Sequence, residues 1–220
     1  MKVINLADTC SITNQYIAEL RDKHIQQDRL RFRQNVVRIG RIMAYESSKR
    51  LEPKTLAVET PLAHTKVEVP SSNGIVLGTV FRAGLPFHQG FLETFDNADN
   101  AFVSAYRYYR DNECTEVGVK IEYIASPPLD GKTLIIVDPM LATGESMELA
   151  YQALLTKGTP ARLLLACVIA CQQGVSHLQQ LFPDDKVTLF CAAIDPILNE
   201  RKYIVPGLGD AGDLMYGEKV

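Results

Sequence analysis

Short apolar runs rich in β-branched residues alternate with helical patterns along most of the chain, and this alternation limits the folds open to it. The apolar runs lie at residues 74–81, 101–105, 117–124, 133–137, 163–169 and 186–192. Helical patterns separate several of them, at residues 85–95, 146–157 and 172–181. Strands that alternate with helices form a largely parallel sheet flanked by helices on both faces. Because no repeat or linker interrupts the pattern, the sequence predicts a single α/β domain over residues 1–220.

The first 51 residues have a different pattern, and we expect them to form a helical arm beside a core at residues 52–220. A long helix is predicted over residues 28–51 by apolar side chains at helical spacing, namely Phe32, Val36, Ile39 and Met43. Asp28 is its candidate N-cap, and Pro53 follows its end. Residues 13–22 predict a shorter helix. An amphipathic helix outside the sheet pattern suggests an oligomer contact, so we expect a homodimer or a higher homo-oligomer.

Charge and hydropathy argue against several classes of protein. The net charge of -3 gives no general attraction for nucleic acid, although the arginines at residues 29–41 are an argument for RNA binding. No apolar run reaches the roughly 18 residues that a membrane span needs. The first ten residues, MKVINLADTC, lack the apolar region of a signal peptide. We therefore expect a cytoplasmic protein with no membrane contact and no nucleic-acid partner.

The five cysteines do not form a recognisable metal or redox pattern. Three of them, Cys167, Cys171 and Cys191, lie in apolar runs, which is typical of buried free thiols. Cys167 and Cys171 are four residues apart, so they are not a CxxC pair and predict neither a zinc site nor a redox couple.

Two glycine motifs match phosphate-binding patterns only in part. Residues 207–212 fit GxGxxG, but a dinucleotide site needs this turn to open a βαβ unit, and only eight residues follow. Residues 131–133 resemble the end of a P-loop, but Ser126 stands where the first glycine is required, and a strand follows instead of a helix. Neither motif predicts a nucleotide site of these two classes.

The strongest local signal for a ligand is the segment at residues 133–146. An apolar run leads to Asp138 and then to a turn of small residues that opens a helical pattern near Gly144. A helix that begins there exposes unpaired N–H groups, and its dipole favours an anion. Thr143 and Ser146 add hydroxyl donors. The pattern therefore predicts a phosphate site at the carboxyl end of a parallel strand, where open α/β sheets bind ligands.

Asp138 has two interpretations. A carboxylate beside a phosphate suits a sugar, because it can accept hydrogen bonds from two vicinal hydroxyls. An acid in this place is also common at an ordinary junction between a strand and a helix. The spacing alone does not decide between them.

Four segments resemble those of the type I phosphoribosyltransferases, in the version shared by uracil phosphoribosyltransferases. DPMLATGES at residues 138–146 resembles the loop that binds 5-phosphoribosyl-1-pyrophosphate (PRPP). FRAGL at residues 81–85, AYR at 105–107 and YIVPGLGDAGD at 203–213 resemble three further segments, and MAYES at 43–47 is a weaker match. They stand in the family's order. The resemblance implies the family's fold and the conversion of uracil and PRPP into UMP and pyrophosphate.

The resemblance also implies roles for single residues. PRPP would contact the loop residues Asp138, Pro139, Met140, Leu141, Ala142, Thr143, Gly144, Glu145 and Ser146. Within this loop Ala142 to Ser146 would hold the 5′-phosphate, and Asp138 would face the ribose hydroxyls. Arg82 and Arg107 would pair with the pyrophosphate, with Arg110 as an alternative to Arg107. Mg²⁺ would be held by PRPP and water, with no direct protein ligand, because Pro139 stands where many relatives have a second acid.

Uracil recognition is implied for the glycine-rich C-terminal segment. The base presents an acceptor, a donor and an acceptor, which the backbone at Ile204, Gly209 and Ala211 would complement. Asp210 would face the ribose or the hydrated Mg²⁺. Arg82, Arg107, Asp138 and Asp210 are thus the expected catalytic residues.

One departure from the family pattern leaves alternatives open. Glu145 stands where the family has a small residue, and we expect its side chain to point away from the phosphate. The same fold without turnover would be a sensor of PRPP or UMP, or an RNA-binding pyrimidine regulator. Activation by GTP is compatible with the resemblance, and the sequence does not decide it.

Overall fold

The computed structural model describes residues 1–109, 117–183 and 186–218, and for residues 105–109 and 117–120 only the backbone is considered. Among these residues eight strands form the main sheet, in the order β1-β10-β9-β7-β4-β5-β6, with β8 also paired to β9. They are β1 (Lys2–Asn5), β4 (Ile75–Phe81), β5 (Asp99–Tyr109), β6 (Val117–Ala125), β7 (Thr133–Val137), β8 (Met140–Leu141), β9 (Arg162–Cys171) and β10 (Val187–Asp195). Every pairing is parallel except that of β5 with β6. The predicted fold class is confirmed.

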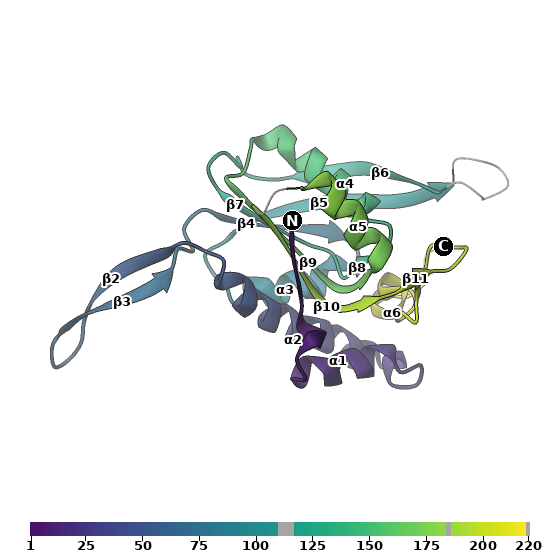
Figure 1. Cartoon of the computed structure of the whole chain (residues 1–220), viewed down its shortest axis with the longest axis horizontal. Coiled ribbons are helices and arrows are strands. Elements are labelled where there is room, and N and C mark those ends of the chain that lie inside the picture. Colours follow the sequence, from purple (N-terminus) through teal and green to yellow (C-terminus); the bar gives the residue numbers. More distant parts are fainter. Residues whose placement is uncertain (110–116, 184–185, 219–220) are drawn as a thin grey trace.

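Helices cover both faces of this sheet, as Figure 1 shows. One face carries α1 (Ile12–Arg21), α2 (Arg29–Ser48) and α3 (Gly84–Leu92), and the other carries α4 (Glu145–Leu154) and α5 (Gln172–Leu181). Side chains of β7 alternate between them: Ile135 and Val137 join the cluster under α2, and Leu134 and Ile136 join the cluster under α4. A strand buried on both faces reads as an unbroken apolar run, which is why residues 133–137 could be assigned from the sequence.

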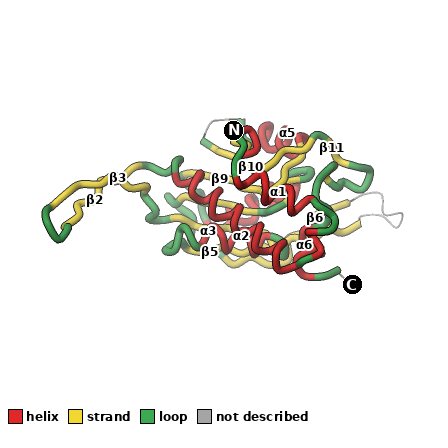
Figure 2. The backbone as a smooth tube through the Cα atoms, turned by 90° about the horizontal axis from the view of Figure 1, so that it is seen from below, coloured by secondary structure: helices red, strands yellow, loops and turns green. Residues whose placement is uncertain are grey.

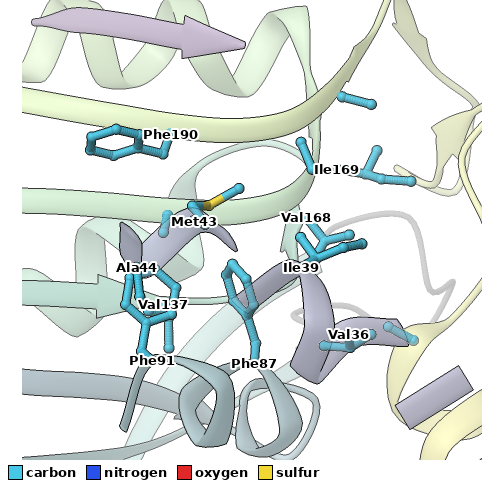
Figure 3. Close-up of a cluster of buried hydrophobic side chains, with 14 of the residues drawn as sticks. Val36, Ile39, Met43, Ala44, Phe87, Phe91, Val137, Val168, Ile169 and Phe190 are labelled. Atoms are coloured by element: carbon cyan, nitrogen blue, oxygen red, sulfur yellow. The ribbon is translucent and has the colours of Figure 1, made fainter. Parts of the chain in front are cut away.

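The long helix α2 places its apolar stripe on the sheet (Figure 3). Val36, Ile39 and Met43 pack in one cluster with Phe87 and Phe91 of α3. Each of these five side chains is at most 1% exposed, so the face is closed within the chain. The predicted N-cap is also confirmed, because the Asp28 Oδ1 atom accepts a 3.0 Å hydrogen bond from the backbone N–H of Arg31.

Residues 1–51 form part of the layered core, although their sequence pattern suggested a separate arm. Residues 2–5 form β1, a short edge strand paired in parallel with β10, and α1 and α2 cover the sheet. The boundary at residue 51 stays a prediction. The argument that α2 is free to make a dimer contact loses its basis, however, because its apolar stripe is used inside the chain.

A hairpin that the sequence patterns did not predict projects from the body of the molecule (Figures 1 and 2). Its antiparallel strands are β2 (Pro53–Glu59) and β3 (His64–Pro70), which form a sheet of their own. Leu56, Leu62 and Val67 are exposed on it, Leu62 to 97%. These apolar side chains have no cover from the described part of the chain.

The remaining elements are short. They are the 3-10 turns η1 (Leu6–Asp8), η2 (Ile25–Gln27) and η3 (Leu155–Lys157), the paired strands β11 (Ile197–Leu198) and β12 (Ile204–Val205), and the helix α6 (Ala211–Tyr216). None of the described helices is long and apolar enough to cross a lipid bilayer. Cys167, Cys171 and Cys191 are free and fully buried in β9 and β10, as predicted. Burial raises the pKa of the Cys167 thiol well above its ordinary value, which makes the thiolate rare there.

Glu19 on α1 forms an ion pair whose contribution to stability should depend on pH. Its carboxylate accepts hydrogen bonds from Arg31 (2.8 and 3.0 Å) and from the Asn35 Nδ2 atom (2.7 Å). The hydrogen bonds, chiefly those from Arg31, lower the pKa of Glu19 from 4.5 to about 2. A carboxyl group whose pKa is lower in the folded chain stabilises the fold above its unfolded pKa and loses that effect as the pH falls.

We therefore expect Glu19→Gln to lower the free energy of unfolding at pH 7. The difference from the wild type should shrink as the pH falls from 4.5 to about 2, where Glu19 itself becomes protonated. Urea unfolding at a series of pH values measures this difference, with Glu68→Gln on exposed β3 as the control. A difference that stays constant across this pH range would contradict the assignment.

Candidate functional site

A cavity of about 560 Å³ lies at the carboxyl ends of β4 and β7. Three segments form its wall: the end of β4 with the turn that follows, the loop after β7, and the C-terminal loop. The lining residues are Val80, Phe81, Arg82, Ala83, Ser104, Asp138, Met140, Ala142, Ser146, Lys202, Tyr203, Ile204, Gly209, Asp210, Ala211 and Gly212. The fold thus brings together three of the segments that the sequence singled out, although Arg82 and Gly212 lie 130 residues apart in the chain.

The loop after β7 has the geometry of an anion cradle. β7 ends at Val137, and the Asp138 Oδ1 atom accepts a 3.3 Å hydrogen bond from the Met140 backbone N–H. Gly144 is the N-cap of α4 with φ +92°, a conformation that favours glycine. The first turn of α4 therefore directs backbone N–H groups and the positive end of its dipole toward the loop.

Close packing behind this loop explains why Gly144 has no side chain. A Cβ atom there would lie 2.9 Å from the His177 Cδ2 atom and 3.3 Å from the Gly174 carbonyl oxygen on α5. His177 is itself held by a 2.7 Å contact between its Nε2 atom and the Glu148 carboxylate on α4. The loop thus packs closely against α5.

The predicted loop residues do not all face the cavity with their side chains. Asp138, Met140, Ala142 and Ser146 line it. Leu141 is 2% exposed and packs in the core beneath α4 and α5, so only its backbone can face a ligand. The Thr143 hydroxyl accepts a 3.4 Å hydrogen bond from the backbone N–H of Glu145, an arrangement that orders the turn.

Arg82 follows β4 and places its guanidinium at the cavity wall. Its Nη2 atom donates a 2.9 Å hydrogen bond to the Asp213 Oδ1 atom on α6, and its side chain is 39% exposed. The peptide bond between Phe81 and Arg82 is cis. Arg82 therefore links the β4 wall to the C-terminal wall.

The C-terminal loop offers mainly backbone to the cavity. Gly207 and Gly209 have φ of +58° and +92°, and a Cβ atom on Gly207 would lie 2.1 Å from the Ile204 carbonyl oxygen. Asp210 caps α6, because its Oδ1 atom accepts a 3.0 Å hydrogen bond from the Asp213 backbone N–H. A chain turning this tightly with little side-chain bulk suits contacts between peptide groups and a flat ligand.

Two predicted arginines cannot be placed at the site. Arg107 lies on β5 with its backbone opposite Val119, and its side chain is outside the described part of the structure. Arg110 is outside the described residues altogether. The strands β5 and β6 pair in antiparallel fashion.

Several lining residues had no signal in the sequence analysis. Ser104 reaches the cavity because β5 lies next to β4, a neighbourhood that comes from the sheet order. Lys202 has φ +59°, which is uncommon for a residue with a side chain. This backbone conformation is visible only in the structure, so no sequence pattern could have marked Lys202.

Glu145, the first residue of α4, lies beside Lys202, which lines the cavity. The Glu145 Oε1 atom lies 3.9 Å from the Lys202 Nζ atom, and both side chains are more than a third exposed. The Glu145 side chain thus points toward Lys202 and the C-terminal loop, and not into the cradle that its own backbone helps to form. The two charges connect the loop after β7 to the C-terminal loop.

The cavity wall also carries the carboxylates of Asp138 and Asp210. Carboxylate oxygens are hard donors of the kind that Mg²⁺ prefers, either directly or through water. No group of three or more histidine, cysteine or acidic side chains gathers as a cation cage in residues 1–109, 117–183 and 186–218. The carboxylates of Asp138 and Asp210 fit a hydrated Mg²⁺ ion, which they can face directly or through water.

Comparison with known proteins matches nearly the whole chain to one family. The model of the uracil phosphoribosyltransferases matches residues 8–218. The chain belongs to the uracil phosphoribosyltransferase family. A uracil phosphoribosyltransferase of Porphyromonas gingivalis is 54% identical over 220 residues, which is 100% of both chains. One of Pyrococcus furiosus is 37% identical over 206 residues, covering 93% of this chain and 85% of that one.

A solved structure has the same overall form. A protein from Aquifex aeolicus superposes with a TM-score of 0.85 at 28% identity, and the match covers 99% of each chain. The family match includes both loops that line the cavity, so the short resemblances in the sequence belong to a relationship that extends over nearly the full length.

Proposed function

We propose that the chain transfers the phosphoribosyl group of PRPP to uracil, giving UMP and pyrophosphate. The observation that carries the proposal is that an anion cradle and a backbone-rich loop line one cavity in a member of this family. A ribose phosphate on the cradle would direct its C1′ atom toward the C-terminal loop, where a base can approach.

The loop after β7 would hold the ribose 5-phosphate end of PRPP. Backbone N–H groups from Ala142 to Ser146 would hold the 5′-phosphate at the start of α4, with hydroxyls from Thr143 and Ser146. Pro139, Met140 and Leu141 would contribute backbone contacts along the loop. Asp138, which lines the cavity beside this loop, would accept hydrogen bonds from the ribose hydroxyls.

Arg82 would bind the pyrophosphate as the leaving group. Its planar fork can contact phosphate oxygens bidentately, and phosphate would then compete with Asp213 for the same guanidinium. We keep Arg107 as the second pyrophosphate contact, on the strength of the family motif. Mg²⁺ bound by PRPP and water would neutralise part of the pyrophosphate charge, with Asp138 and Asp210 facing its hydration shell.

Uracil would be read by peptide groups of the C-terminal loop. The base needs a donor, an acceptor and a donor. Ile204, Gly209 and Ala211 line the cavity, and their peptide groups would supply them. Cytosine would place its amino group against a donor. A buried mismatch of this kind discriminates strongly between the two bases.

Catalysis would follow from position and charge. Uracil N1 attacks ribose C1′ as the bond to pyrophosphate breaks, and the N1 proton leaves to the departing pyrophosphate or to water. The ribose passes through an oxocarbenium-like state, as in other glycosyl transfers. The residues named here orient the two reactants and stabilise the departing pyrophosphate.

A comparison of three bases tests the proposal. UMP formation would be followed with PRPP, Mg²⁺ and either uracil, cytosine or orotate. We expect turnover with uracil and at least about 100-fold lower kcat/KM with cytosine, because a mispaired buried polar group is costly. A preference for orotate would overturn the base assignment. PRPP binding without turnover would favour the sensor.

Glu145 provides a prediction about PRPP affinity. Its negative charge next to the cradle repels a phosphate, and Lys202 offsets it only in part across 3.9 Å. We expect Glu145→Gln to lower the KM for PRPP by about two- to fivefold, the range of a solvated charge interaction, and salt should shrink the effect. Glu68→Gln makes the same change in net charge on remote β3. An equal change in both variants would contradict a local role for Glu145.

A homodimer stays part of the proposal, with the β2–β3 hairpin as its supporting feature. The hairpin projects from the body and exposes apolar side chains (Figures 1 and 2). Sedimentation at micromolar concentration tests the dimer, and a monomer would refute it. A cytoplasmic location remains a prediction from the sequence.

A further inference from the structure

Asp195 is a nearly buried carboxylate that the proposed reaction does not use. It is the last residue of β10, its side chain is 6% exposed, and it is not part of the cavity wall. Arg21, the last residue of α1, binds it with both arms of the guanidinium: Nη2 to Oδ1 at 2.6 Å and Nη1 to Oδ2 at 2.8 Å. The pair joins the N-terminal helix to β10, the strand next to the edge strand β1.

The same pair holds both peptide groups of Gly207. The Asp195 Oδ2 atom accepts a 2.8 Å hydrogen bond from the Gly207 N–H, and the Arg21 Nη1 atom donates a 2.9 Å hydrogen bond to the Gly207 carbonyl oxygen. Gly207 lies between Ile204 and Gly209, which both line the cavity. Its position therefore sets where the peptide groups on either side of it can lie.

The local backbone leaves Gly207 little freedom to find another place. Its φ is +58°, and a Cβ atom would lie 2.1 Å from the Ile204 carbonyl oxygen. Leu208 is 5% exposed and packs in the cluster under α2, which closes the turn from the other side. In Figures 1 and 2, α1 and the segment from β11 to α6 lie at the same end of the molecule.

We propose that Arg21 and Asp195 are positioning residues for base recognition, an inference that rests on the proposed uracil site. They contact no part of the cavity themselves and act through Gly207. Their removal should let the C-terminal loop shift relative to the loop after β7. Uracil affinity should then fall, while the PRPP contacts on the other wall stay in place.

Asp195→Asn is the sharpest test of this role. The Asp195 carboxylate accepts three hydrogen bonds, two from Arg21 and one from the Gly207 N–H. An asparagine amide supplies only one acceptor atom, so in either orientation its NH₂ group faces a donor. Arg21→Lys is the milder variant, because it keeps a positive charge beside Asp195. One ammonium group still cannot reproduce the planar fork.

The chain contains a matched control on the same helix. Glu19 and Arg31 also form a two-armed ion pair that joins α1 to α2, but neither contacts the C-terminal loop. Glu19→Gln makes the same chemical change, from a carboxylate to an amide, in a comparable pair. It should lower stability without a selective effect on uracil.

Steady-state UMP formation would first be measured for the wild-type protein. This measurement tests the proposed function independently of the variants. For Asp195→Asn we expect the KM for uracil to rise about tenfold or more, as for a lost hydrogen bond to a charged group, with the KM for PRPP within about twofold. Arg21→Lys should give a smaller change in the same direction, and it replaces Asp195→Asn if that variant does not fold. Equal changes in both KM values, an unchanged KM for uracil, or the same selective change in Glu19→Gln would overturn the inference.

Discussion

Replacing Arg82 by glutamine should lower the turnover of uracil to UMP by about 100-fold, the effect of removing one charged contact on the order of 3 kcal/mol from a transition state. The guanidinium lies on the cavity wall at the end of β4, where it can reach the leaving group. Because the negative charge of pyrophosphate grows as the bond to ribose breaks, the loss should appear mainly in kcat. Steady-state kinetics with PRPP varied at saturating uracil separate kcat from KM.

A second variant distinguishes the cation from the ion pair that it makes. Asp213→Ala removes the carboxylate that accepts the 2.9 Å hydrogen bond from Arg82 but keeps the guanidinium available for pyrophosphate. It should lower kcat far less than Arg82→Gln does. If the two variants lose the same activity, the contact between β4 and α6 is what matters, and Arg82 has no separate role in stabilising the leaving group.

Gly144→Ala should raise the KM for PRPP at least about tenfold. A methyl group at φ +92° costs on the order of 1 kcal/mol in backbone strain, and this one also meets the His177 ring at 2.9 Å. A shift of the loop away from α5 relieves the contact and displaces the N–H groups that would hold the phosphate. Titration of PRPP binding and kinetics at varied PRPP both report the change.

The control for this variant has the same backbone strain without the contact. Gly131 has φ +72°, and a Cβ atom there would meet no other atom within 4 Å. Gly131→Ala should introduce a similar strain energy and so lower the free energy of unfolding by a similar amount. It should leave the KM for PRPP unchanged. A loss of PRPP affinity in both variants would show that general instability, and not the cradle, is responsible.

The elements that could be predicted from the sequence are those whose local pattern reports their burial. The helix α2 has a cap at Asp28 and an apolar stripe, and β7 is an unbroken apolar run. Both were assigned within a few residues. The turn between β7 and α4 was also predictable, because Gly144 and its neighbours restrict the backbone to a small set of shapes.

The elements that could not be predicted lack such a pattern. In the described part of the chain the strands β2 and β3 pair only with each other, and they are largely exposed. No buried face therefore imposes a strong alternation on residues 53–70. β1 has four residues and α6 has six, too few to show a period. These segments depend on contacts with distant parts of the chain.

The site shows the same division. Asp138 and Gly209 stand in motifs that can be recognised locally, and the structure places both on the cavity wall. Asp195 has no motif, and its partners Arg21 and Gly207 lie 174 residues before it and 12 residues after it. A carboxylate at the end of a strand indicates a function only when the fold shows what it holds.

A crystal structure with UMP bound tests the central claim most directly. We expect the phosphate of UMP at the backbone N–H groups of residues 142–146, and the pyrimidine ring against the peptide groups of Ile204, Gly209 and Ala211. A nucleotide whose phosphate lies away from the start of α4, or whose base points away from the C-terminal loop, would contradict the account.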